Sequence, residues 1–180
     1  MGVDETRFTE IYMRLYSRVW SFARRRASDS GAHDATDEAF LIAWQKLHQL
    51  PEDPLPWLLV AARNVLSENR RRDDRQDALV ERIVASSPNL ASAEPGAEHA
   101  VVERLAVLGA MESLSARDRE TLMLTAWDGL SHAQAAEVMG CSISAFGVRH
   151  HRARRRLEAA LSAQDRGNAR PTIRIERDAR

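Results

Sequence analysis

Residues 115–161 constrain the fold most, because they contain two helical segments joined by a tight turn. Ser131 and Gln134 have the S-x-x-Q spacing of a capping box, in which each side chain satisfies a free backbone N–H at a helix start. Gly140 stands where a left-handed residue closes a helix, and Ser142 can cap a second helix. The spacing predicts a helix-turn-helix, whose second helix enters the DNA major groove by its N-terminal residues.

The second of these helices has one apolar line and a basic remainder. The line recurs at i, i+4, i+7 and i+11, and it consists of Phe146, His150, Ala153 and Leu157. The other faces carry arginines with no acid before Glu158, namely Arg149, Arg152, Arg154, Arg155 and Arg156. Such a row would neutralise phosphates along a groove wall. The alternative is a helical hairpin in another bundle with a solvated basic face.

The charge distribution says more than its sum. The chain has 180 residues, 44% of them hydrophobic and 29% charged, and its formal net charge is zero. This composition is typical of a soluble protein with one or two small domains. Acids gather at residues 34–38 and 94–103, whereas bases gather at 63–75 and 149–156. The neutral total therefore hides two basic patches.

Several classes of protein are not expected from this sequence. A single cysteine, Cys141, allows no internal disulfide, which favours a small buried residue in a reducing cytoplasm over a redox sensor. No apolar run approaches the roughly 18 residues of a membrane span, and no signal segment opens the chain. The six histidines are scattered and no phosphate-cradling glycine loop is present, so we expect no enzyme activity, metal or cofactor.

Two amphipathic helices are predicted near the N-terminus. Apolar residues recur at three- and four-residue intervals from Phe8 to Ala23, and a second helix is expected to begin near Ala32. The acids of the second helix lie at i, i+3 and i+4 and share one face; they are Asp34, Asp37 and Glu38. They either complement the helix dipole or form a surface that binds a partner.

A proline-rich loop and a third helix follow. Prolines at 51, 54 and 56 exclude a continuous helix over residues 48–56. The third helix is predicted from about Pro56 to residues 69–72. Its polar side could meet nucleic acid or be a solvated helix end, and it consists of Arg63, Asn64, Ser67, Arg70 and Arg71.

Composition places a domain boundary after the third helix, where Ser, Pro and Gly become frequent. We expect an all-α protein with a first helical domain over residues 1–75 and a flexible linker over 76–97. A compact four-helix domain with the helix-turn-helix is expected over 98–161. Residues 162–180 lack helical periodicity and are charged, which predicts a disordered tail.

Three segments share their residues and spacing with one known family. They read Asp34-x-x-Asp37-Glu38-x-Phe40-x-x-Ala43-Trp44, then Trp57-Leu58-x-x-Ala61-x-Arg63-Asn64, then Gly129-Leu130-Ser131…Ala136-x-x-Met139-Gly140-Cys141-Ser142…Arg149-x-His151-Arg152-Ala153-Arg154-x-x-Leu157. Together these segments resemble an extracytoplasmic-function (ECF) sigma factor, a small member of the sigma-70 family of bacterial RNA polymerase. The resemblance covers roughly residues 6–161, nearly the whole chain outside the tail.

The resemblance implies roles for the first domain, called sigma-2. Asp34, Asp37 and Glu38 match the residues that bind the clamp coiled coil of the largest polymerase subunit. The loop over 48–56 would hold a base flipped out of the −10 promoter element. The helix with Arg63, Asn64, Ser67, Arg70 and Arg71 would line the exposed strand, which fits the need of single-stranded DNA for a cationic groove.

For the second domain, sigma-4, the resemblance implies binding of the −35 element and of the flap of the second-largest polymerase subunit. The expected DNA contacts are Ser144, Ala145, Val148, Arg149 and Arg152. The implied protein is a non-enzymatic cytoplasmic subunit that is held inactive by an anti-sigma factor, with no membrane insertion. The alternative is a free-standing helix-turn-helix regulator, which would bind a two-fold operator and leave the acidic helix and proline loop without a task.

The chain departs from the family pattern at a few positions. Gly147 stands where a basic residue is usual, and Val148 replaces a small polar residue and could touch a thymine methyl. His150 replaces an aliphatic residue, and we interpret it as packed rather than as a pH sensor. On the acidic helix, Asp37 replaces glutamine and His33 replaces an acid, which would adjust the polymerase contact.

Overall fold

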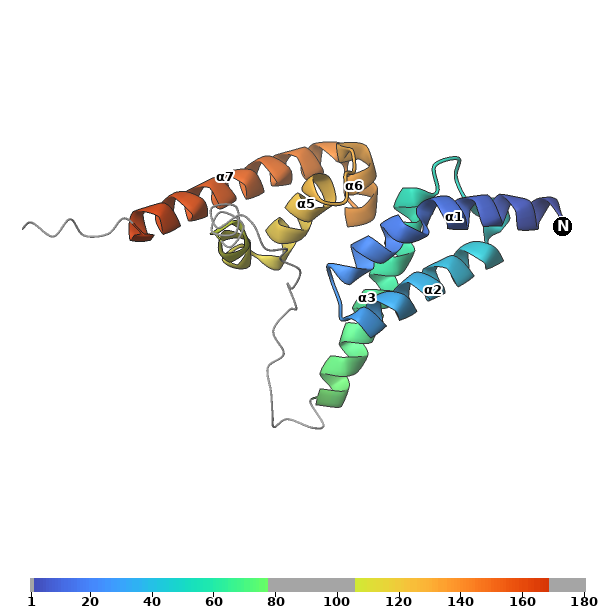
Figure 1. Ribbon diagram of the computed structural model, residues 1–180. Coiled ribbons are helices and arrows are strands. Elements are labelled where there is room, and N and C mark those ends of the chain that lie inside the picture. The colour runs from blue at the N-terminus through green and yellow to red at the C-terminus, as the bar shows by residue number, and fades with distance from the viewer. Residues whose placement is uncertain (1, 78–105, 169–180) are drawn as a thin grey trace, which may run out of the picture. The chain divides into compact units, whose positions relative to one another are not determined.

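The computed structural model describes residues 2–77 and 106–168, and every regular element in these two ranges is a helix (Figure 1). The elements are α1 (Val3–Arg24), α2 (Asp29–Gln45), the 3₁₀ helix η1 (Leu47–Gln49), α3 (Leu55–Asp77), α5 (Ala116–Ala126), α6 (His132–Met139) and α7 (Ile143–Asn168). Residues 106–112 are also helical and precede α5. The predicted all-α fold is confirmed for this part of the chain.

The chain divides into two compact units that are not two consecutive halves. The first contains residues 1–92 and 123–147, and the second contains 93–122 and 148–180. The linker expected over 76–97 lies outside the described residues except for its first two positions, which end α3. The domain limits drawn from the sequence stay a prediction.

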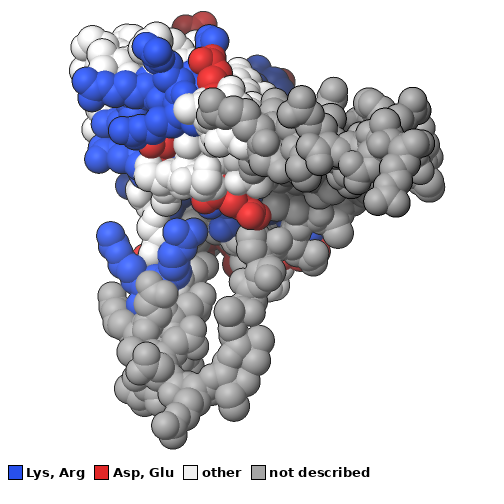
Figure 2. All heavy atoms as spheres, turned by 90° about the vertical axis from the view of Figure 1, so that its left-hand side faces the viewer, with Lys and Arg blue, Asp and Glu red and all other residues white. Residues whose placement is uncertain are grey.

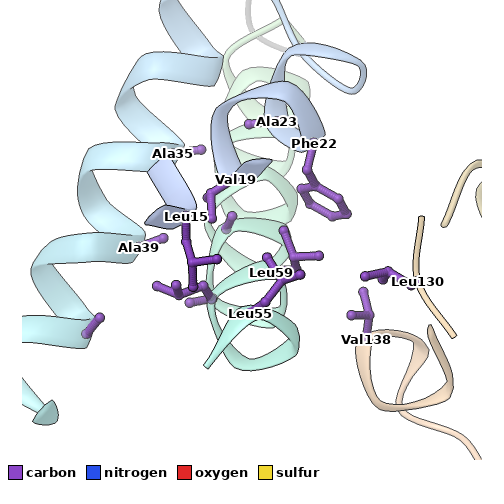
Figure 3. Close-up of a cluster of buried hydrophobic side chains, with 14 of the residues drawn as sticks. Leu15, Val19, Phe22, Ala23, Ala35, Ala39, Leu55, Leu59, Leu130 and Val138 are labelled. Carbon is purple, nitrogen blue, oxygen red and sulfur yellow. The ribbon is translucent and has the colours of Figure 1, made fainter. Parts of the chain in front are cut away.

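The first unit is built on α1, α2 and α3, which pack against one another pairwise (Figure 1). Leu15, Val19 and Phe22 of α1 are buried, and small residues of α2 let that helix approach closely. On α3, Leu55 and Leu59 contribute to the same cluster, which Leu130 and Val138 extend from the α6 region (Figure 3). The first unit therefore buries one continuous apolar cluster, the main stabilising term of such a fold.

Two helices of this unit differ in length from the prediction. Helix α2 begins at Asp29 rather than near Ala32, because Ser28 has an extended backbone and its Oγ accepts a hydrogen bond from the Gly31 amide at 3.4 Å. Helix α3 continues to Asp77, past the expected end at 69–72. The proline loop is shorter than expected, since η1 occupies Leu47–Gln49 and α3 already begins at Leu55.

The predicted helix-turn-helix is present with its predicted caps. The Ser131 amide donates to Gln134 Oε1 at 2.9 Å, and the Gln134 amide donates to Ser131 Oγ at 3.2 Å, which completes the capping box of α6. Gly140 ends α6 with φ 62° and ψ 43°, the left-handed conformation that only glycine adopts at little cost. The Ala145 amide donates to Ser142 Oγ at 3.2 Å and so caps α7.

Helix α7 ends later than the sequence indicated. We expected disorder from residue 162, but the helix runs to Asn168. The segment after Leu157 contains Ala159, Ala160 and Ala163, and alanine has the highest helix propensity of all residues. Propensity therefore extends the helix where apolar periodicity has ceased, and residues 169–180 lie outside the described range.

The second unit has its own small core. Its buried apolar side chains are Ala110, Met111, Leu114, Leu122 and Ala153. Arg119 of α5 also ties down the preceding helix, because its Nε donates to the Met111 carbonyl and its Nη2 to the Glu112 carbonyl, both at 2.9 Å. These bonds satisfy carbonyl groups that the end of a helix would otherwise leave unpaired.

Candidate functional site

The acidic face predicted on α2 exists in the structure. Asp34, Asp37 and Glu38 are all exposed, whereas their neighbours Ala35, Thr36 and Ala39 are buried. Within residues 2–77 and 106–168, no ion pair engages any of the three acids. Three uncompensated carboxylates on one face are suited to a cationic protein partner and would repel DNA.

Asp37 also acts on a tyrosine of α1. Burial, and then the negative charge of Asp37, raise the pKa of Tyr16 above its ordinary value of 10.0. The phenol therefore stays neutral at physiological pH and leaves the charge of the face unchanged. Tyr16 in turn stacks on Phe40 with 5.9 Å between ring centroids, which fixes the spacing of α1 and α2.

A groove of about 650 Å³ lies between α2 and α3 and connects two of the predicted surfaces. Asp34 and Glu38 line it from α2, and Asn64 lines it from α3. Glu68 and Arg72 also line it and form an ion pair at 2.7 Å between Arg72 Nη2 and Glu68 Oε1. The structure thus brings two of the three polymerase-binding candidates, Asp34 and Glu38, together with one −10 candidate, Asn64.

The −10 candidates on α3 differ in accessibility. Asn64, Ser67, Arg70 and Arg71 are exposed along one stretch of the helix. Arg63 is less accessible, because it is half-buried and its Nη1 donates to the Val138 carbonyl at 3.3 Å. A contact of Arg63 with DNA would require this bond to break, whereas the other four side chains need no rearrangement.

The −35 candidates share one side of α7. Ser144, Ala145, Val148, Arg149 and Arg152 lie at i, i+1, i+4, i+5 and i+8, so a helix places them together. Ser144, Ala145 and Arg152 are exposed, Val148 is 53% exposed, and Arg149 is half-buried. Phe146, which points the other way, is fully buried. The sequence therefore predicted correctly that the side of α7 with Phe146 and Ala153 is buried.

The arginines of α7 are not equivalent. Arg154 Nη2 lies 3.2 Å from Glu158 Oε1 in an exposed i,i+4 pair, and Arg156 is paired with the buried Asp118. For Arg152 and Arg155 the described residues contain no ion-pair partner. Figure 2 views the molecule from the left-hand side of Figure 1, where α7 ends, and shows Lys and Arg side chains gathered over this helix.

Sequence reasoning did not find two buried acids, Asp118 and Asp128. Asp128 pairs with Arg25 and Arg26, which directly follow α1, and the distance between Arg26 Nη2 and Asp128 Oδ2 is 2.8 Å. Its partners lie more than one hundred positions away, so no local pattern signals the contact. The spacing of Ser115 and Asp118 did contain a signal, since it is that of a helix cap, and the Asp118 amide donates to Ser115 Oγ at 3.1 Å.

The described ranges contain neither a cluster of three or more His, Cys, Asp or Glu side chains that could hold a metal ion nor a helix with the length and hydropathy of a membrane span.

Two family models match the chain. The model described as "Sigma-70 region 2" matches residues 11–76, and that described as "Sigma-70, region 4" matches residues 104–157. The chain is 30% identical over 167 residues to RNA polymerase sigma factor NccH of Alcaligenes xylosoxydans xylosoxydans, covering 89% of each protein. It is also 30% identical over 150 residues to ECF RNA polymerase sigma factor SigL of Mycobacterium tuberculosis, covering 79% of this chain and 82% of SigL.

Solved structures agree with these matches. The sigma factor RpoE of Bartonella quintana, solved in complex with the anti-sigma factor NepR, superposes with a TM-score of 0.69 at 25% identity, over 86% of this chain and 96% of RpoE. CnrH, solved with the cytosolic domain of CnrY, shares the fold with a TM-score of 0.58 at 24% identity, over 87% of this chain and 88% of CnrH. The chain belongs to the sigma-70 family and, within it, to the ECF RNA polymerase sigma factors.

Proposed function

We propose that this sigma factor binds core RNA polymerase through the acidic face of α2 and promoter DNA through α3 and α7. The observation that carries the proposal is the presence of two exposed surfaces of opposite charge on one chain. The acids of α2 repel DNA and need a cationic protein surface, whereas the arginines of α7 attract phosphates.

At the −10 element, Asn64, Ser67, Arg70 and Arg71 line the melted strand along α3. Two arginines one helical turn from a polar pair provide the charge and hydrogen-bond donors that a single strand requires. The loop before α3 holds an unstacked base. Its Asp53 is already fixed, because Oδ1 accepts from the Leu55 amide at 3.3 Å and Oδ2 accepts from Gln134 Nε2 at 2.8 Å.

At the −35 element, the N-terminal half of α7 enters the major groove. Ser144 and Ala145 lie in its first turn, where a recognition helix meets base edges, and Val148 offers an apolar contact to a thymine methyl. Arg149 and Arg152 position the helix on the phosphates. Sigma-2 over residues 1–75 and sigma-4 over 98–161 thus act as two separate readers joined by the linker over 76–97.

The protein acts in the cytoplasm as a binding subunit and catalyses no reaction itself; the polymerase performs the chemistry. An anti-sigma factor that covers the acidic face of α2 would block its use by polymerase. RpoE of Bartonella quintana was solved in complex with the anti-sigma factor NepR, and this chain shares the fold of RpoE over 86% of its length, which supports an anti-sigma factor as a partner of this chain too.

Run-off transcription with bacterial core polymerase on fragments of the host genome tests the proposal. We expect discrete transcripts that depend on this protein and that fall about tenfold in the double variant Asp34→Asn, Glu38→Gln, since two uncompensated contact charges are lost. The matched control is Glu10→Gln on α1, another exposed acid, which should transcribe like the wild type.

Two outcomes would overturn different parts of the proposal. If the double variant transcribes as well as the control, the acidic face of α2 is not the polymerase contact. If the protein binds duplex sites alone but never directs core polymerase to a start site, its surfaces serve a free-standing regulator.

A further inference from the structure

Asp118 is a buried acid that the promoter-reading surfaces leave without a role. It lies in the first turn of α5, and its side chain is only 7% exposed. A buried carboxylate is costly unless it is paired and hydrogen-bonded. The local cap at Ser115 satisfies part of this need, so the remaining partner decides what the residue does.

That partner is Arg156 of α7, whose Nη1 donates to Asp118 Oδ2. Burial alone would raise the pKa of Asp118. Hydrogen bonds from Arg156 and from the Ser115 hydroxyl, together with the positive charges of Arg156 and Arg149, lower this pKa below its ordinary value of 3.8. Asp118 is therefore ionised at neutral pH and attracts two arginines of α7.

The ion pair with Arg156 shows which side of α7 faces Asp118. Arg149 and Arg156 are seven residues apart, which is two helical turns and about 10 Å along the axis. Arg152 lies between them on the same side, at i+3 from Arg149. Arg156, which Asp118 holds, thus lies on the same side of α7 as the −35 candidates Arg149 and Arg152.

We propose that Asp118 is a positioning residue for promoter recognition, which fixes the rotation of α7 on α5 by holding Arg156 and so withdraws Arg156 from phosphate binding. The inference rests on the proposed reading of the −35 element by α7. In this arrangement Arg152 binds a DNA phosphate. Arg156 instead holds in place the helix that carries Arg152.

The competing account is that Arg156 contacts a phosphate directly, because 61% of its side chain is exposed. The two accounts predict opposite signs for the neutral variant Asp118→Asn. If Arg156 binds phosphate, removal of a nearby negative charge strengthens DNA binding. If Asp118 positions α7, the same change weakens binding although the protein becomes more positive.

The experiment measures binding of the holoenzyme, formed from the full chain and core polymerase, to a promoter fragment over a range of salt concentrations. We expect Asp118→Asn and Arg156→Gln each to weaken binding about fivefold at fixed salt. In Arg156→Gln the slope of log affinity against log salt should be unchanged, because the arginine it removes contacts no phosphate. Their double variant should be no weaker than either one. Arg152→Gln is the comparison, and it should reduce the slope by about 0.9, the value for one lost phosphate contact.

The inference is overturned if Arg156→Gln reduces the salt slope as Arg152→Gln does, if Asp118→Asn strengthens binding, or if the two changes add. Arg156→Lys guards against misfolding of the neutral variants, because it keeps the charge but loses the planar fork. It should also weaken binding, and wild-type affinity in this variant would contradict the inference. If instead no variant, Arg152→Gln included, alters promoter binding, the proposed −35 surface itself has failed.

Discussion

The two compact units each bury one aspartate on arginine, but the partners differ in kind. In the first unit Asp128, with 2% of its side chain exposed, is held by Arg26, which is itself only 8% exposed and lies over the Phe22 ring at 3.6 Å from its centroid. In the second unit Asp118 is held by Arg156, an exposed residue of α7. The same pair of chemical groups is a closed internal contact in one unit and, in the other, a contact with the helix that we propose binds the −35 element.

This difference shows which charges of the chain are compensated within the protein and which are available to a partner. Arg26 also donates through Nη1 to the Phe22 carbonyl at 2.8 Å, so its guanidinium group is engaged by partners inside the protein. Arg156 looks like part of a basic face in the sequence, yet it is compensated by an acid from α5. The acids of α2 show the opposite case, because their charge is free for a partner.

The largest effect on stability is expected from loss of the internal contact. Asp128→Ala would leave Arg25 and Arg26 without their carboxylate, which costs about 3–5 kcal/mol when the remaining charge is buried. Urea unfolding followed by circular dichroism measures this change. The matched control is Asp29→Ala, which removes an exposed partner of Arg24 and should cost no more than about 1 kcal/mol. Equal losses in the two variants would show that burial does not distinguish these pairs.

A smaller effect, with a defined pH dependence, is expected at Asp118. Because the pKa of Asp118 is lowered in the folded state, its contribution to stability is present above the ordinary value of 3.8 and is lost as the pH falls through the lowered pKa. We expect Asp118→Asn to cost about 1 kcal/mol, since the partner is exposed, and this cost to be constant between about pH 7 and pH 5.

Unfolding of the wild type and of Asp118→Asn at a series of pH values tests this expectation. The two free energies of unfolding should approach each other only below about pH 4. A difference that already closes between pH 7 and pH 5 would contradict a lowered pKa for Asp118.

The smallest effect is expected from a substitution within α7. It distinguishes the stability of this helix from its position. No atom lies within 4 Å of a Cβ built on Gly147, so Gly147→Ala fits and should stabilise the helix by up to about 1 kcal/mol. In the Asp118→Asn background, this change should recover thermal stability without recovering promoter affinity. Recovery of both would mean that Asp118 acts through the general stability of the unit alone.

The sequence predicted the features of this protein that depend on local spacing. The Ser131 and Gln134 box, the Gly140 closure and the acidic face of α2 were all readable, because capping and helical periodicity act within a few residues. The predicted start of α2 is wrong by three residues, because Ser28, which reads as part of a polar loop in the sequence, caps the helix.

Contacts between distant segments could not be predicted in this way. Arg25 and Arg26 end a helix, where basic residues already have a reason to be, so nothing in the sequence pointed to Asp128. The hydrogen bond from Arg63 to the Val138 carbonyl could not be predicted from the sequence either, although the prediction that Arg63 lies on the polar side of its helix is correct.

Permanganate footprinting of a promoter obtained by run-off transcription tests the central claim most directly, because it detects unpaired thymines. The account predicts reactive thymines around the −10 element only when core polymerase and this protein are both present. Arg70→Ala, Arg71→Ala should reduce that reactivity while protection of the −35 element persists. Protection of a duplex site by the protein alone, with no unpaired thymines in the presence of polymerase, would contradict the account.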